Sequence, residues 1–81
     1  MDELSLEVIG MFARFAKETL DLHELFEAGG NDPNTRTLVF DTVERLIKGG
    51  LLEERGNDFY SLTELGRGVA REYPRPAKDE D

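Results

Sequence analysis

The chain has 81 residues, of which 38% are hydrophobic and 35% are charged, and its net charge is −8. A chain of this length can bury one small core, so the composition predicts a single domain. No run of eighteen apolar residues, no signal-peptide pattern and no cysteine is present, which argues against a membrane-spanning helix, disulfides and thiolate metal sites. We therefore expect a soluble, cytoplasmic protein.

The first predicted helix covers residues 4–16. Apolar residues recur at helical spacing along one side, which is typical of a helix that lies on a core. This stripe consists of Leu4, Val8, Met11, Phe12 and Phe15. A weaker apolar strip follows another side of the helix and consists of Leu6, Ile9, Ala13 and Ala16. Since a small core is expected to cover one side only, this strip is either a homodimer interface or a set of ordinary exposed apolar residues.

A short extended link at Thr19 and Leu20 leads into a second predicted helix, at about residues 22–28. Asp21 and Glu24 have the spacing of a capping box, and the glycines at 29 and 30 are suited to end a helix. The only histidine, His23, falls on the outward side of this helix. It has no companion ligands at metal-binding spacing and no nucleophile to activate, so we interpret it as a solvated side chain.

The third predicted helix covers residues 33–48, with Asp32 as its N-cap and Pro33 in its first position. Its core face follows the spacing i, i+4, i+7, i+8 and consists of Val39, Val43, Leu46 and Ile47. The opposite face is the one that a partner can reach. It carries Asn34, Thr37, Leu38, Asp41, Glu44, Arg45 and Lys48, with Arg36 and Phe40 at its shoulder.

A hairpin is predicted next, with strands at residues 51–55 and 59–62 and a polar turn at residues 56–58. Leu52 and Leu62 are its expected inward anchors. A last helix begins at the N-cap Thr63 and ends at Pro74 and Pro76. Its glycines, Gly66 and Gly68, indicate either close packing or a frayed helix. Residues 1–74 thus form the predicted domain, and the acidic residues 75–81 form a disordered tail.

The segment VERLIKGGLLEERGNDFYSLTELGRGVA resembles the recognition-helix end, wing and following helix of small winged helix-turn-helix regulators of the MarR, PadR and ArsR types. The matching residues are Gly50, Leu51, Leu52, Glu53, Tyr60, Leu62, Thr63, Gly66 and Arg67. The resemblance implies a mainly α fold with a small β-hairpin, in the order α-(β)-α-α-β-β-α. It also implies that helix 33–48 enters the major groove and that hairpin 51–62 contacts the backbone as a wing.

The exposed residues support this role in part. Near the start of helix 33–48, four residues can bind base edges or phosphates: Asn34, Thr35, Arg36 and Thr37. Further candidates for phosphate and wing contacts are Arg45, Lys48, Arg55 and Asn57. Asp41 and Glu44 oppose them from the same surface, and each arginine also fits an ordinary solvated position.

We therefore expect a sequence-specific DNA-binding transcriptional regulator that binds double-stranded DNA and forms a homodimer through helix 4–16. The alternative is an acidic winged-helix module that docks a basic protein partner or mimics DNA. A continuous positive strip over helix 33–48 and the wing favours the first hypothesis, and an acidic or apolar strip favours the second. No phosphate loop, metal cluster or Ser/His/Asp set is present, so we expect no enzyme, no cofactor and no metal site.

Overall fold

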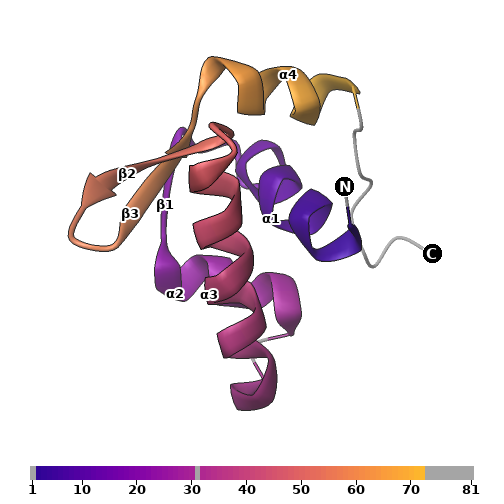
Figure 1. The fold of residues 1–81 in the computed structure, drawn as a ribbon, viewed down its shortest axis with the longest axis vertical. Coiled ribbons are helices and arrows are strands. Elements are labelled where there is room, and N and C mark those ends of the chain that lie inside the picture. Colours follow the sequence, from indigo (N-terminus) through magenta and orange to yellow (C-terminus); the bar gives the residue numbers. More distant parts are fainter. Residues whose placement is uncertain (1, 31, 73–81) are drawn as a thin grey trace.

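The computed structural model describes residues 2–30 and 32–72, which are mainly helical and include a small three-stranded antiparallel sheet. In the view of Figure 1 the strands lie to the left of α3 and α1 lies to its right. The elements in chain order are α1 (Glu3–Arg14), β1 (Thr19–Asp21), α2 (Leu22–Leu25), the 3-10 helix η1 (Phe26–Gly29), α3 (Pro33–Lys48), β2 (Leu52–Gly56), β3 (Phe59–Leu62) and α4 (Glu64–Glu72). This is the order of helices and strands that the sequence predicts.

α3 has the predicted bounds because both of its ends carry residues suited to them. Asp32 accepts a hydrogen bond from the backbone N–H of Asn34 at 3.0 Å, and Pro33 occupies the first turn, where no N–H donor is needed. Beyond the other end Gly50 has a φ of +81°, a conformation that glycine adopts without strain. The predicted core face is confirmed, with three buried residues and one half-buried residue: Val39, Val43, Leu46 and Ile47.

α1 differs from its prediction in two ways. It ends at Arg14, because Ala16 has a left-handed φ of +54° that does not belong to a helix. The expected outward strip is interrupted as well: Ile9 is 1% exposed and belongs to the core, whereas Leu6 is half-buried and Ala13 and Ala16 are exposed. α1 packs against α3, η1 and α4, so the core extends further around this helix than the single face we expected. The proposed dimer face therefore loses its central residue.

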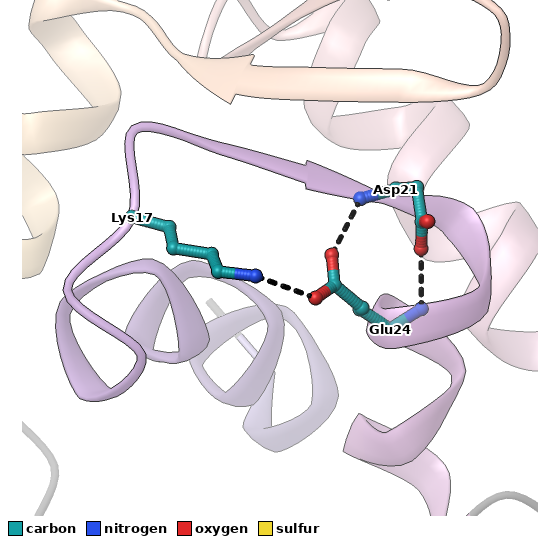
Figure 2. A network of polar contacts seen from close by, with 3 residues as sticks. All are labelled: Lys17, Asp21 and Glu24. Carbon is teal, nitrogen blue, oxygen red and sulfur yellow. Dashed lines mark hydrogen bonds and ion pairs between the residues drawn. The ribbon is translucent and has the colours of Figure 1, made fainter.

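The predicted capping box is present at the start of α2 (Figure 2). The carboxylate of Asp21 accepts a hydrogen bond from the backbone N–H of Glu24 at 2.8 Å, and Glu24 accepts one from the backbone N–H of Asp21 at 3.0 Å. The other carboxylate oxygen of Glu24 lies 3.0 Å from Nζ of Lys17. The helix predicted over residues 22–28 is divided, because the backbone tightens into the 3-10 helix η1 after Leu25.

The hairpin reverses at Asn57 and Asp58, which both have positive φ, 53° and 64°. This is the two-residue turn whose twist matches that of the hairpin strands. A bulge between Glu54 and Gly56 interrupts the register of β2 and β3. The expected extended link at residues 19–20 belongs to a third strand, β1, which pairs antiparallel with β3.

One side of the sheet faces the core. Leu20 of β1 pairs with Tyr60 of β3, and their exposed fractions are 0% and 4%. Of the two predicted anchors, Leu52 is buried, as expected, and Leu62 is half-buried. Tyr60 is a core residue that we did not expect from the sequence. Its position follows from strand alternation, since it lies two residues from Leu62 on the same side of β3.

α4 begins after Thr63, whose hydroxyl makes two hydrogen bonds. The Thr63 hydroxyl accepts a hydrogen bond from the backbone N–H of Gly66 at 3.1 Å and donates one to the carbonyl oxygen of Gly50 at 2.5 Å. Gly66 packs closely, because a Cβ at this position would overlap the carbonyl oxygen of Leu51. The predicted tail, residues 75–81, lies outside the described residues.

Candidate nucleic-acid interface

α3 presents to solvent the face that helical periodicity predicts. Its exposed residues include Asn34, Thr37, Leu38, Asp41, Glu44, Arg45 and Lys48, together with Arg36 and Phe40 at the shoulder. In Figure 1 the first turns of α3 project below α2 and η1, away from the sheet and from α4. The face divides into an N-terminal half, residues 33–40, and a C-terminal half, residues 41–48, which differ in charge.

The N-terminal half contains no Asp or Glu and one arginine. The guanidinium carbon of Arg36 lies 5.5 Å from the centre of the Phe26 ring in η1, a cation-π contact. This contact orients the guanidinium group and leaves its N–H donors available to a partner. The exposed side chains of Asn34 and Thr37 make no hydrogen bond to another described residue. This half of the helix thus exposes three hydrogen-bonding side chains and contributes no carboxylate, with Asn34 and Thr37 on the outward face and Arg36 at the shoulder nearer the core.

Thr35, which we expected among the DNA-binding residues, has a structural role instead. It is half-buried, and its hydroxyl lies 2.8 Å from the carbonyl oxygen of Gly29 and 2.8 Å from that of Asp32. The hydroxyl hydrogen therefore joins the first turn of α3 to the end of η1. Thr35 positions the neighbouring side chains of the exposed face and is not itself presented to a partner.

The C-terminal half has mixed charge. Asp41 and Glu44 are exposed beside Arg45 and Lys48, but neither carboxylate forms an ion pair with another described residue. Arg45 instead lies 3.3 Å from the carboxylate of Asp2, at the start of α1. Lys48 makes no ion pair within residues 2–30 and 32–72. The two acids therefore form no ion pair with either cation, but they lower the local potential that a phosphate would meet.

The Arg45–Asp2 pair connects α3 to α1. The pKa of Asp2 lies below its ordinary value, because Asp2 accepts hydrogen bonds from Ser5 and also faces the guanidinium of Arg45. Both side chains remain more than half exposed, at 57% for Arg45 and 58% for Asp2. Exposed pairs of this kind contribute little to stability, so Arg45 can exchange this carboxylate for a phosphate at small cost.

The hairpin offers less to a polyanion than we expected. Arg55 lies 3.4 Å from the carboxylate of Glu53, its neighbour on the same strand. Glu54 and Asp58 add two further carboxylates, so the hairpin carries three acids and one arginine. Asn57 is exposed in the turn and has a left-handed backbone. Of the two predicted wing contacts, Arg55 is paired with Glu53, whereas Asn57 remains available to a partner.

The space between the hairpin and α3 is acidic as well. Burial raises the pKa of the Tyr60 hydroxyl, and the nearby carboxylates of Glu54, Asp58 and Glu44 raise it further. These three acids come from β2, the turn and α3, so they approach one tyrosine from different elements. A continuous positive strip over α3 and the hairpin, which would favour DNA, is therefore not present on the described residues.

The structure also exposes apolar side chains that a nucleic acid does not require. Leu38 is 55% exposed and Phe40 is 41% exposed, and both lie on α3. Phe26 of η1 is half-buried and has the guanidinium group of Arg36 over its ring. Helical periodicity predicts the positions of Leu38 and Phe40 on α3. The Phe26–Arg36 contact joins two elements and has no signal in the sequence.

No family model, curated protein or solved structure matches the chain. Among residues 2–30 and 32–72, no helix has both the length and the apolar character to cross a membrane. The same residues include no group of three or more His, Cys, Asp or Glu side chains placed to hold a metal ion.

Proposed function

We propose that this chain is a winged-helix DNA-binding protein, a transcriptional regulator that reads sequence with the N-terminal half of α3. The supporting observation is the exposed start of this helix, residues 33–40, which presents Asn34, Arg36 and Thr37 and has no acid of its own beyond the N-cap Asp32. In helix-turn-helix proteins the N-terminal residues of the recognition helix contact base edges in the major groove. Asparagine has the donors and acceptors to recognise adenine, and arginine those to recognise guanine.

The arrangement of the elements supports the same proposal. α2 and η1 precede α3 as the first helix of a helix-turn-helix would, and the β2–β3 hairpin follows α3 as a wing. Thr35 fixes the start of α3 against η1, and Phe26 orients Arg36. The reading side chains are thus held by contacts that do not consume their own hydrogen-bonding groups.

The wing has a minor part in this proposal. Arg55 must leave Glu53 to reach a phosphate, and the other hairpin acids repel the backbone. The described residues carry 15 Asp and Glu against 8 Lys and Arg, so few phosphates can be neutralised. The logarithm of the binding constant falls with the logarithm of salt concentration by about 0.9 for each neutralised phosphate, so we expect a shallow slope.

A gel shift on pooled genomic duplex fragments at low and high salt tests the proposal. We expect a shift at low salt and binding weakened about tenfold or more by Arg36→Ala, because a base contact is lost. Arg55→Ala should weaken binding less, and by the same factor for all DNA sequences, because it removes a phosphate contact. The matched control is Arg14→Ala, an arginine of α1 that pairs with Glu7. No shift at low salt, or equal loss from Arg36→Ala and Arg14→Ala, contradicts the proposal.

Docking of a protein on α3 is a second candidate, favoured by the exposure of Leu38 and Phe40 and by the lack of a continuous positive strip over α3 and the hairpin among the described residues. Apolar side chains at the centre of an exposed helix face are typical of helix-mediated protein contacts. A photo-crosslinking amino acid placed at position 38 and activated by light in cells distinguishes DNA binding from protein docking. Crosslinked products that nuclease shortens support DNA binding. Products of defined mass that only protease removes support protein docking.

A further inference from the structure

The outer side of the sheet, away from the core, forms the base of a groove. Thr19 of β1 pairs with Ser61 of β3, which pairs with Glu53 of β2, so these side chains form a row across all three strands. This row alternates with the buried pair Leu20 and Tyr60 and therefore lies on the opposite side of the sheet. The end of α1 and one side of α4, from Glu64 to Arg71, border the groove, whose volume is about 720 Å³.

This groove concentrates positive charge on an acidic molecule. Four of the eight basic side chains of the described residues line it: Lys17, Arg55, Arg67 and Arg71. Three carboxylates line it as well: Glu18, Glu53 and Glu64. The lining thus carries one net positive charge, whereas acids outnumber bases by seven over the described residues as a whole. Small apolar surfaces contributed by Ala13, Leu62 and Ala70 lie between the charged groups.

Two arginines of α4 are placed to hold an anion. Arg67 and Arg71 are separated by one helical turn and line the same groove. Arg67 donates a hydrogen bond to the carbonyl oxygen of Leu62 at 3.2 Å, which fixes its side chain. Arg71 makes no ion pair or hydrogen bond with another described side chain. By contrast Lys17 and Arg55 are already paired, with Glu24 and Glu53.

We propose that this groove binds a small organic monocarboxylate, with its carboxylate on Arg67 and Arg71 and its apolar body on Leu62 and Ala70. The groove has the size of small-molecule sites, and guanidinium groups hold carboxylates through paired hydrogen bonds. A monoanion fits better than a dianion, because Glu18, Glu53 and Glu64 repel additional negative charge. The site does not depend on DNA binding by α3, because no residue of α3 lines it.

Titration of the full 81-residue chain with benzoate, followed by amide chemical shifts at constant ionic strength, tests the site. We expect shifts concentrated at residues 61–71, with benzyl alcohol binding at least about tenfold more weakly because it lacks the charge. Phenyl phosphate should also bind more weakly than benzoate, because it approaches a dianion at neutral pH. Equal binding of benzyl alcohol, tighter binding of phenyl phosphate, or shifts spread over the whole chain would overturn the proposal.

Two matched variants locate the anion. Arg71→Gln should weaken the binding of benzoate at least about tenfold, because it removes an ionic hydrogen bond to the carboxylate. Since Arg71 has no partner among the described side chains, the substitution should not disturb the fold. Arg14→Gln, an equal change in charge on α1 at a residue that does not line the groove, should leave benzoate binding unchanged. The dispersion of the amide spectrum shows that both variants are folded. Similar affinities for Arg71→Gln and the unaltered chain would overturn the assignment to α4.

Discussion

Gly66 and Gly68 lie two residues apart in α4 and have different surroundings. A Cβ at Gly66 would overlap the backbone carbonyl oxygen of Leu51, which cannot turn away as a side chain can, whereas a Cβ at Gly68 meets nothing within 4 Å. We predict that Gly66→Ala lowers the free energy of unfolding by about 1–3 kcal/mol, through overpacking. Gly68→Ala should raise it by about 0.5–1 kcal/mol, through helix propensity. Urea denaturation measures both, and equal effects would show that α4 does not pack on Leu51.

Single residues also mark the limit of prediction for the candidate interface. Periodicity correctly places Asn34 and Thr37 on the outward side of the helix, whereas it placed Arg36, which is exposed, on the shoulder nearer the core. It does not reveal that the Thr35 hydroxyl bonds back to Gly29, six residues earlier. It also does not reveal the contact between Arg36 and Phe26. Both contacts depend on how α3 meets η1, and local spacing does not encode that geometry.

At the scale of one element, the capping box of α2 makes stability depend on pH. The pKa of Glu24 lies below its ordinary value of 4.5, chiefly because its carboxylate accepts the Asp21 N–H and also because it binds Lys17. A carboxylate whose pKa is lower in the folded state stabilises the fold above its ordinary pKa. This contribution is lost as the pH falls through the lowered value.

We therefore predict that Glu24→Gln lowers the free energy of unfolding at pH 7 and that the difference shrinks below about pH 4.5. Glutamine retains an acceptor for the Asp21 N–H but cannot titrate or pair with Lys17. Urea denaturation at pH 7 and at about pH 3 measures the change. Glu27→Gln is the control, an exposed carboxylate of η1 without a partner among the described residues. A difference for Glu24→Gln that is the same at both pH values would count against the capping box.

α1 shows why an element can be predicted while its surroundings are not. Its apolar stripe predicts the helix, and Val8, Met11 and Phe12 are indeed buried. The number of elements packed around the helix is not visible in its own sequence. We assumed that the core covers one side of α1, whereas α3, η1 and α4 all pack on it. Ile9 was therefore assigned to the wrong environment.

The burial of Ile9 leads to a stability prediction. Ile9→Ala should lower the free energy of unfolding by about 2–4 kcal/mol, because it removes buried methyl groups and leaves a cavity. Leu6→Ala, at a half-buried position of the same helix, should have a smaller effect. Thermal and urea denaturation, with the mass from light scattering, measure the change. A fully stable Ile9→Ala variant whose mass is halved would instead support Ile9 as a dimer contact.

At the scale of the whole molecule, the distribution of charge was the least predictable feature. The order of the elements follows from caps, turns and periodicity, which are local. The Arg45–Asp2 pair joins residues 43 positions apart, and the carboxylates around Tyr60 come from separate elements. The hairpin carries three acids of its own, whereas residues 33–40 of α3 carry none. This difference in charge between the two regions restricts the proposed DNA contact to one end of a single helix.

The central claim is that the first turns of α3 contact duplex DNA. The most direct test titrates the isotope-labelled chain with a duplex that it binds in the gel shift and follows the backbone amide chemical shifts. Each amide signal reports on the surroundings of its own residue. We predict that the largest changes lie at residues 34–38, with smaller changes at Lys48 and Asn57 and none in the groove beside α4. Changes centred elsewhere, or none at a duplex concentration that saturates the gel shift, would contradict the claim.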